Sequence, residues 1–122
     1  MQDLLTIVIP CYNEELYIGR TLRHIKRQLG TDGVRIIISD AGSVDSTLSI
    51  IEKLKNQLDL RVEVVKGGLP AVGRNAGADL ATTPYLLFID ADITFTDKTA
   101  ISRALADRKS TRLNSSHIPL SR

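Results

Sequence analysis

The stretch that decides the fold is Leu86-Leu87-Phe88-Ile89-Asp90-Ala91-Asp92. A short apolar run of this kind, with chain breakers on either side, is typical of a strand buried on both faces of a sheet. It ends in two carboxylates one residue apart, and their mutual repulsion has to be offset. A divalent cation such as Mg²⁺ would do so, because it takes carboxylate oxygens and shares its remaining shell with substrate phosphates. The alternative is that Asp90 and Asp92 cap the next helix or lie in a solvated turn.

The composition is that of an ordinary globular chain. With 122 residues, of which 43% are hydrophobic and 25% charged, the chain is long enough for one domain with a single core. No apolar run approaches the roughly 18 residues of a membrane-spanning helix, and no secretory signal opens the sequence. The single cysteine, Cys11, fits a reducing compartment, and we expect a packed residue at a strand end rather than a nucleophile.

The last residues, 107–122, differ from the rest of the chain. They hold four of the 16 Lys and Arg residues and one of the 14 acids, so the body before them has a net charge of −1. The apparent basicity therefore gives no argument for nucleic-acid binding. The segment has no apolar periodicity and resembles the translation of a short-read sequencing adapter. We expect an incomplete domain over residues 1–106, with a natural protein that continues beyond it, and a non-native or disordered basic tail over 107–122.

Four strands are expected to alternate with four helices. The strands are predicted at 4–10, 34–39, 61–66 and from Tyr85 onward, with the third near an edge because it alternates. The first helix is expected to follow an Asn13 N-cap and to bury Ile18, Leu22, Ile25 and Leu29, leaving Arg20, Arg23, Lys26 and Arg27 on a solvated face. Asp45 or Ser46 can cap the second helix, which buries Leu48, Ile51, Leu54 and Leu58. The third carries Arg74 to Ala81, and Asp97 can cap the fourth. This order predicts an α/β fold, a parallel sheet with helices on both faces.

Unusual residues follow every predicted strand. Ligands of open α/β sheets bind beyond the carboxyl ends of the strands, so these residues are expected to meet at one edge. They are Tyr12, Asn13 and Glu14; Asp40, Gly42 and Ser43; Gly67 and Gly68; Asp90 and Asp92; with Arg74 and Asn75 facing the same edge. The chain has neither a Gly-x-Gly-x-x-Gly turn after the first strand nor a Gly-Lys-Ser/Thr loop, which disfavours dinucleotide-binding dehydrogenases and Walker-type nucleotidases.

These residue types suit a nucleotide diphosphate. Tyr12 can stack on a base, and Asp40 can accept a hydrogen bond from a base imide N–H. Arg74 can meet phosphate charge or the base edge. Asp90 can bind a ribose hydroxyl, while Asp92 binds a cation that bridges the two phosphates.

Four segments resemble the N-terminal half of family 2 glycosyltransferases, the inverting GT-A group. The opening strand and loop at 6–15 and the segment Ser39-Asp-Ala-Gly-Ser-Val-Asp-Ser-Thr47 are similar to the first two family motifs. Gly73-Arg-Asn-Ala-Gly77 and Phe88-Ile-Asp-Ala-Asp92 resemble its Ala-Arg-Asn-x-Gly helix and its Asp-x-Asp metal motif. The match covers about Leu5 to Leu105. Ala41 departs from the usual second Asp, and Gly73 from the usual Ala.

The resemblance implies a Rossmann-like GT-A domain that binds a UDP- or GDP-linked sugar for transfer to an acceptor hydroxyl. It implies Mg²⁺ or Mn²⁺ at Asp92, with Asp90 beside it, and a location in the cytoplasm or at the cytoplasmic face of a membrane. The family's general base comes from a later part of the protein, so no catalytic residue is assigned here. The implied nucleotide-sugar-binding residues are Pro10, Tyr12, Glu14, Asp40, Arg74, Asn75, Asp90 and Ala91.

Two alternatives stay open at this point. A sugar-phosphate nucleotidyltransferase has the same fold but usually carries a Gly-rich loop with Arg and Lys after the first strand, where this chain has Cys-Tyr-Asn-Glu-Glu. A non-catalytic α/β module would use Asp90 and Asp92 only as caps. In that case their removal would leave stability unchanged or raised, and metal would not shift the melting temperature.

Overall fold

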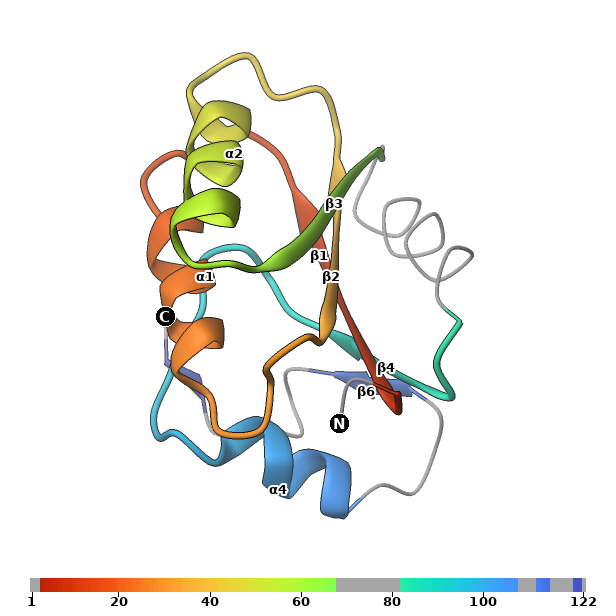
Figure 1. Ribbon diagram of the computed structural model, residues 1–122. Helices are drawn as coiled ribbons and strands as arrows, with labels where there is room; N and C mark the ends of the chain where they lie inside the picture. The colour runs from red at the N-terminus through yellow and green to blue at the C-terminus, as the bar shows by residue number, and fades with distance from the viewer. Residues whose placement is uncertain (1–2, 68–81, 108–111, 115–119, 122) are drawn as a thin grey trace.

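A parallel sheet forms the centre of the molecule. The computed structural model describes residues 3–67, 82–107, 112–114 and 120–121. The strands run in the order β3-β2-β1-β4-β6, all parallel. Their order reverses at β1, where β2 and β4 flank it on opposite sides, and ligands of such sheets bind at this switch. The strands are β1 (Leu5–Cys11), β2 (Arg35–Asp40), β3 (Arg61–Lys66), β4 (Tyr85–Phe88) and β6 (Arg112–Asn114); Figure 1 labels them.

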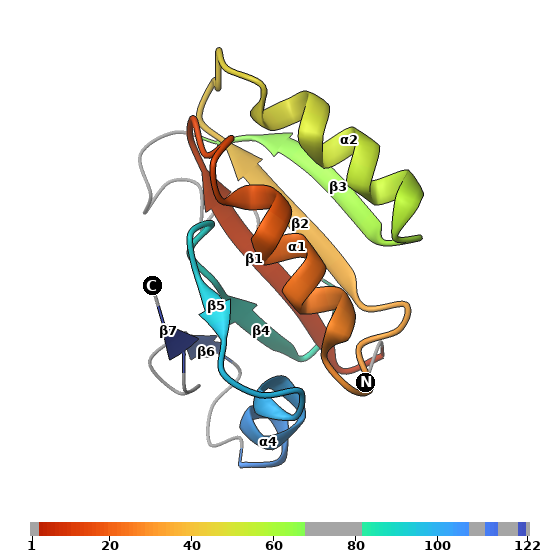
Figure 2. The same cartoon turned by 90° about the vertical axis from the view of Figure 1, so that its left-hand side faces the viewer.

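The described helices pack into one core. α1 (Ile18–Arg27) and α2 (Thr47–Gln57) lie side by side over the same face of the sheet in Figure 2. α4 (Ala100–Ala106) joins the same buried cluster. The cluster includes alternate residues of the central strands, because successive side chains of a strand point to opposite faces of the sheet. It includes Leu5, Ile7 and Ile9 of β1, Ile36 and Ile38 of β2, and Ile18, Leu22 and Ile25 of α1.

The α/β class, the parallel sheet and the edge position of β3 are confirmed. The helix expected on the second face falls on residues 68–81 and lies outside the described residues. Buried Val8 and Ile37 belong to that second face by strand alternation. No helix within the described part of the chain is long and apolar enough to cross a membrane.

Several expectations for the helices are wrong. α1 begins at Ile18, with Tyr17 at the N-cap position, so Asn13 does not cap it. It ends at Arg27 because Gln28 turns to extended backbone (ψ 133°), and this leaves Leu29 exposed. Leu48 of α2 is also exposed rather than buried. At the start of α2, Asp45 Oδ1 accepts a hydrogen bond from Thr47 N at 2.9 Å, close to the expected role.

The expected tail contributes two short strands. Arg112–Asn114 (β6) pairs with β4, and Leu120–Ser121 (β7) pairs antiparallel with β5 (Thr94–Phe95). An uncovered strand edge offers unpaired N–H and C=O groups to any extended segment that can reach it. These two pairings are what the structure describes of the tail, and its non-native or disordered character stays a prediction. The domain boundary at 106 stays a prediction as well.

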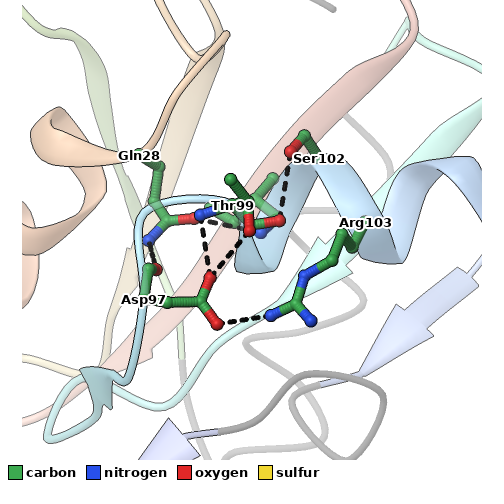
Figure 3. A network of polar contacts seen from close by, with 6 residues as sticks. Gln28, Asp97, Thr99, Ser102 and Arg103 are labelled. Atoms are coloured by element: carbon green, nitrogen blue, oxygen red, sulfur yellow. Dashed lines mark hydrogen bonds and ion pairs between the residues drawn. The ribbon is translucent and has the colours of Figure 1, made fainter.

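A polar network ties the end of α1 to the start of α4. Gln28, which is buried, donates from Nε2 to Asp97 O at 2.6 Å and accepts at Oε1 from Ile101 N at 3.0 Å. Figure 3 shows Asp97 between Thr99 and Arg103, accepting a hydrogen bond from Thr99 N and pairing with the guanidinium of Arg103. The segment that follows Asp92 is thereby fixed against α1.

Candidate functional site

The carboxyl ends of neighbouring strands are joined by backbone hydrogen bonds. Ala41 N donates to Cys11 O at 2.9 Å, which links the end of β1 to that of β2. Gly67 N donates to Asp40 O at 2.7 Å, which adds the end of β3. Ile89 N donates to Val8 O at 3.0 Å, which places the end of β4 beside Val8, three residues before the end of β1. The residues after β4 still reach the same edge, because the carboxylates of Asp92 and Asp90 act on Glu14.

The loop after β1 and the loop after β2 are bonded to each other through side chains. Asn13 Oδ1 accepts from Val44 N at 2.9 Å, and Asn13 N donates to Ser43 Oγ at 2.9 Å. Glu14 N donates to Thr47 Oγ1 at 2.8 Å, and Glu15 Oε2 accepts from Ser46 N at 3.0 Å. Asn13 has a positive φ of 48°, a conformation that Asn tolerates better than most residues. Its role is to join two loops rather than to cap α1.

Asp40 is held in a fixed orientation at the end of β2. It is 6% exposed, and its Oδ2 accepts from Gly42 N at 3.0 Å and Ser43 N at 2.8 Å. Its Oδ1 accepts from Ser43 Oγ. The turn requires a φ of 96° at Gly42, which only glycine adopts without strain. A carboxylate offers about four acceptor positions, so capacity for a ligand hydrogen bond remains.

A cavity of about 360 Å³ opens beside Asp40, between the ends of β2 and β3. Gly67 forms part of its wall, and a Cβ there would lie 3.0 Å from the Ser39 carbonyl carbon, so a side chain would push the two strands apart. The volume is at the lower end of the range for small-molecule sites. Its described lining is Asp40, Ala41, Gly42, Val64, Val65, Lys66 and Gly67.

The Asp90–Asp92 turn is held from behind by α1. Thr21, fully buried, donates from Oγ1 to Ala91 O at 2.7 Å and lies 3.2 Å from Ile93 O. Arg20 Nη2 donates to Asp92 O at 3.2 Å. The expectation that Arg20 belongs to a solvated face is wrong, because the guanidinium reaches back to this turn. These contacts use backbone carbonyls, and none of them uses the Asp92 carboxylate.

The electrostatics of the edge are dominated by acids. Burial raises the pKa of Glu14, and the nearby carboxylates of Asp92, Asp45 and Asp90 raise it further. Burial, reinforced by Asp40 and Glu14, raises the pKa of the Cys11 thiol to about 12. Cys11 is therefore a protonated, packed residue, as predicted, and not a nucleophile. No group of three His, Cys, Asp or Glu side chains within the described residues is arranged to hold a metal by itself.

Most of the predicted site residues are described and lie at this edge. Tyr12 is 55% exposed just beyond β1, whereas Pro10 and Glu14 are half-buried. Beyond β4, Ala91 is buried and its two acidic neighbours are half-buried. Arg74 and Asn75, together with Gly68, lie outside the described residues, so their predicted roles stay predictions.

Sequence reasoning missed the residues that support the site. The sequence could have indicated the role of Thr21, because this polar residue lies in the buried stripe of α1 between Ile18 and Ile25. A polar side chain at such a position needs a hydrogen-bond partner. Nothing in the sequence indicated the role of Arg20, because its spacing along the helix is that of the outer face. Ser43 was placed at the edge but without its role as a donor to Asp40.

Comparison with known proteins gives the family. Residues 6–111 match the family model of Glycosyl transferase family 2. The validoxylamine A glucosyltransferase of Streptomyces hygroscopicus subsp. limoneus is 33% identical over 93 residues, which are 74% of this chain and 20% of that protein. The poly(ribitol-phosphate) beta-N-acetylglucosaminyltransferase TarS of Staphylococcus aureus is 32% identical over 90 residues, or 71% of this chain and 16% of that protein. The chain thus spans about a fifth of the length of these curated relatives.

Solved structures agree with this assignment. The crystal structure of S. aureus TarS 1-349 in complex with UDP-GlcNAc superposes with a TM-score of 0.71 at 30% identity, over 84% of this chain and 30% of that one. The mannosyltransferase PcManGT from Pyrobaculum calidifontis, in complex with GDP-Man and Mn²⁺, gives a TM-score of 0.76 at 24% identity, over 86% and 32%. The second likeness is evidence of a shared fold alone.

Proposed function

The chain belongs to glycosyl transferase family 2, and we propose that it forms the donor-binding part of an enzyme that transfers a sugar from a nucleotide-diphosphate sugar to an acceptor hydroxyl. The observation that carries the proposal is the meeting of acids from three strand ends at the switch in strand order. Asp40, Glu14 and Asp92 come from segments far apart in the sequence. The family match favours this reading over a sugar-phosphate nucleotidyltransferase.

The nucleotide is proposed to bind along this edge with the base in the cavity beside Asp40. The rigid carboxylate accepts a hydrogen bond from the base imide, and the exposed ring of Tyr12 stacks on the base face. Asp90 binds a ribose hydroxyl, while Arg74 and Asn75 complete the pocket. UDP-GlcNAc in the TarS structure supports a nucleotide-sugar donor, and we propose one of the UDP- or GDP-linked class.

A divalent cation is proposed at Asp92, with Asp90 beside it. The residues fit such an ion, because burial and the nearby carboxylates of Asp92, Asp45 and Asp90 raise the pKa of Glu14, so several acids gather at this edge. Mg²⁺ is usually held by one or two carboxylates, substrate phosphates and water, so a complete protein cage is not needed. When bound, Mg²⁺ or Mn²⁺ would neutralise the charge that develops on the leaving diphosphate.

The chain's own residues are proposed to bind and orient the donor. Thr21 and Arg20 hold the acidic turn through its carbonyls, so the carboxylates face the ligand without having to reorganise. The base that activates the acceptor is expected from a part of the protein after the acidic turn. A location in the cytoplasm, or at the cytoplasmic face of a membrane, belongs to the same proposal.

Calorimetric titration tests this proposal. The 122-residue chain is titrated with UDP and with GDP, each with and without Mn²⁺, and Asp92→Asn is compared with Asp32→Asn. Asp32 is 93% exposed and precedes β2 at the opposite edge of the sheet, so this control removes the same charge. We expect metal-dependent binding of one nucleotide that Asp92→Asn abolishes and Asp32→Asn retains. Absence of binding by a folded sample, or equal binding by both variants, overturns the proposal.

A further inference from the structure

A second cavity lies on the helical face, between α1 and α2. Its volume is about 270 Å³, and it is separate in its lining from the cavity beside Asp40. Figure 2 shows the two helices running alongside each other over the sheet, and residues of both helices line the cavity. The described lining is Glu15, Leu16, Gly19, Arg20, Arg23, Ile50, Lys53 and Leu54.

The charge of this cavity is strongly positive. Three lining residues are cations, namely Arg20 and Arg23 from α1 and Lys53 from α2. Within the described residues, no ion pair joins any of them to an acid. Glu15 is the one carboxylate among the described lining, and its Oε2 already accepts a hydrogen bond from Ser46 N. The cavity therefore holds more positive charge than its own acid can offset.

Arg20 adds an unsatisfied donor. Its Nη2 bonds to Asp92 O and its guanidinium lies 5.3 Å from the ring centroid of Tyr17, yet its Nε is buried with no partner in the described structure. A buried N–H without an acceptor is destabilising, so such a group is a place to look for a missing ligand.

Gly19 of α1 leaves room in the cavity for the guanidinium of Arg23. A Cβ at Gly19 would lie 3.3 Å from Arg23 Nη1 and 3.4 Å from Leu54 Cδ1, so the guanidinium of Arg23 lies over bare backbone. Apolar side chains of α2, Ile50 and Leu54, line the same space. A low-dielectric wall strengthens the attraction between these cations and an anion.

We propose that the cavity between α1 and α2 binds a phosphate group, at a site separate from the nucleotide edge and beyond the proposed function. Two guanidinium groups and an ammonium match the oxygens of a phosphate, which arginine binds in a bidentate manner. The volume suits a phosphate or diphosphate group rather than a whole nucleotide. The phosphate belongs either to a soluble ester or to a lipid headgroup, and Leu16 at the cavity mouth is 81% exposed, as a membrane contact would require.

The test uses the 122-residue chain and two double variants with equal loss of charge. Arg23→Gln with Lys53→Gln removes two lining cations. Arg27→Gln with Lys55→Gln removes two cations from the same helices that do not line the cavity. Binding of inorganic phosphate and of diphosphate is followed by ³¹P line broadening, and binding to vesicles with and without phosphatidylglycerol by co-sedimentation. Far-ultraviolet circular dichroism confirms that each variant is folded.

We expect the lining variant to lose at least about tenfold in phosphate affinity, which equals about 1.4 kcal/mol, and the control variant to stay within about twofold. Asp92→Asn should leave this binding unchanged, which separates it from the nucleotide edge. Binding to anionic vesicles that Leu16→Asn weakens identifies the lipid source, whereas phosphate binding without vesicle binding identifies a soluble ester. Equal loss in both double variants, or no binding of either probe, overturns the proposal.

Discussion

The two halves of the carboxyl edge hold their acids in opposite ways. On the β1–β2 side, Asp40 and Glu15 place carboxylate oxygens on backbone N–H groups of the loop after β2. On the β4 side, Thr21 and Arg20 hold the turn by its backbone carbonyls, and none of these contacts uses the Asp92 carboxylate. Acids at one edge thus hold a loop on one side, whereas on the other side the contacts that fix the turn do not involve the Asp92 carboxylate.

This difference tells which acids to test for binding. An acid whose oxygens accept hydrogen bonds from the backbone N–H groups of a loop cannot be removed without cost to the fold, whatever ligand it also meets. An acid in a turn fixed by other groups can be removed with little cost, so its presence calls for another explanation. The predictions below use stability and binding as separate readouts.

The largest effect on stability is expected for Asp40→Ala. Removal of the carboxylate leaves Gly42 N, Ser43 N and Ser43 Oγ without their acceptor at a buried position. The expected loss is about 2–4 kcal/mol in the free energy of unfolding, measured by urea denaturation. Asp92→Ala measured alongside should lose far less. Equal losses in the two variants would remove the distinction between the two halves.

The next largest loss of stability is expected for Thr21→Val, at about 1–3 kcal/mol in the free energy of unfolding. The variant keeps the shape of the side chain but buries Ala91 O without its donor. Thr21→Ser is the matched control, since it retains the hydroxyl and loses a methyl group. If Thr21 positions the turn for a cation, the Val variant also binds Mn²⁺ about 10–100-fold more weakly, as for other outer-shell changes. Calorimetry on both variants measures this, and unchanged Mn²⁺ affinity in a destabilised Val variant would limit Thr21 to a structural role.

Gly42→Ala tests whether the geometry of the Asp40 turn matters apart from its contacts. A Cβ at this position meets no described atom within 4 Å, so any cost comes from the φ of 96°. We expect a loss of about 1–2 kcal/mol by urea denaturation, the usual price of left-handed backbone for a residue with a side chain. Unchanged stability would mean that the turn relaxes and that Asp40 is less rigidly held than its hydrogen bonds indicate.

The fold was predictable because its signals are local. Runs of Ile and Val in β1 and β2 can only be buried strands, and alternation of strands with helices leaves a parallel sheet as the simple arrangement. The meeting of Asp40, Glu14 and Asp92 followed from the same rule about strand ends. Helix ends were less predictable, because α1 begins five residues after Asn13, where contacts to the loop after β2 replace a cap.

The supporting contacts were not predictable for a related reason. The bond from Arg20 to Asp92 O joins residues 72 positions apart, and nothing in the helix periodicity indicates that an outer-face arginine reaches the turn after β4. The pairing of Arg112–Asn114 with β4 depends on an open strand edge, which the sequence of the segment does not reveal. Long-range contacts of this kind are decided by the assembled fold.

Asp92→Asn is expected to change stability by no more than about 0.5 kcal/mol, because the turn is held through carbonyls. Its effect appears only with a ligand. In the unsubstituted chain, Mn²⁺ with UDP or GDP should raise the melting temperature, since a ligand that binds only the folded state stabilises it. The variant should lose that rise, and removal of metal with EDTA should abolish it in the unsubstituted chain. A melting temperature that never responds to metal would favour the non-catalytic alternative.

The smallest effect is a dependence on pH at Glu14. Its pKa lies above the ordinary value of 4.5 because of burial and of Asp92, Asp45 and Asp90, so the folded state binds this proton more tightly than the unfolded state. Stability therefore falls as pH rises from 4.5 through the folded pKa, and the full penalty persists at higher pH. Glu14→Gln should be slightly more stable than the unsubstituted chain near pH 7, and this advantage should vanish as the pH is lowered to about 4. Melting curves across this range measure the difference, which should shrink in an Asp92→Asn background because one of the repelling carboxylates is gone. A difference that is the same with and without Asp92 would mean that the two acids do not share one site.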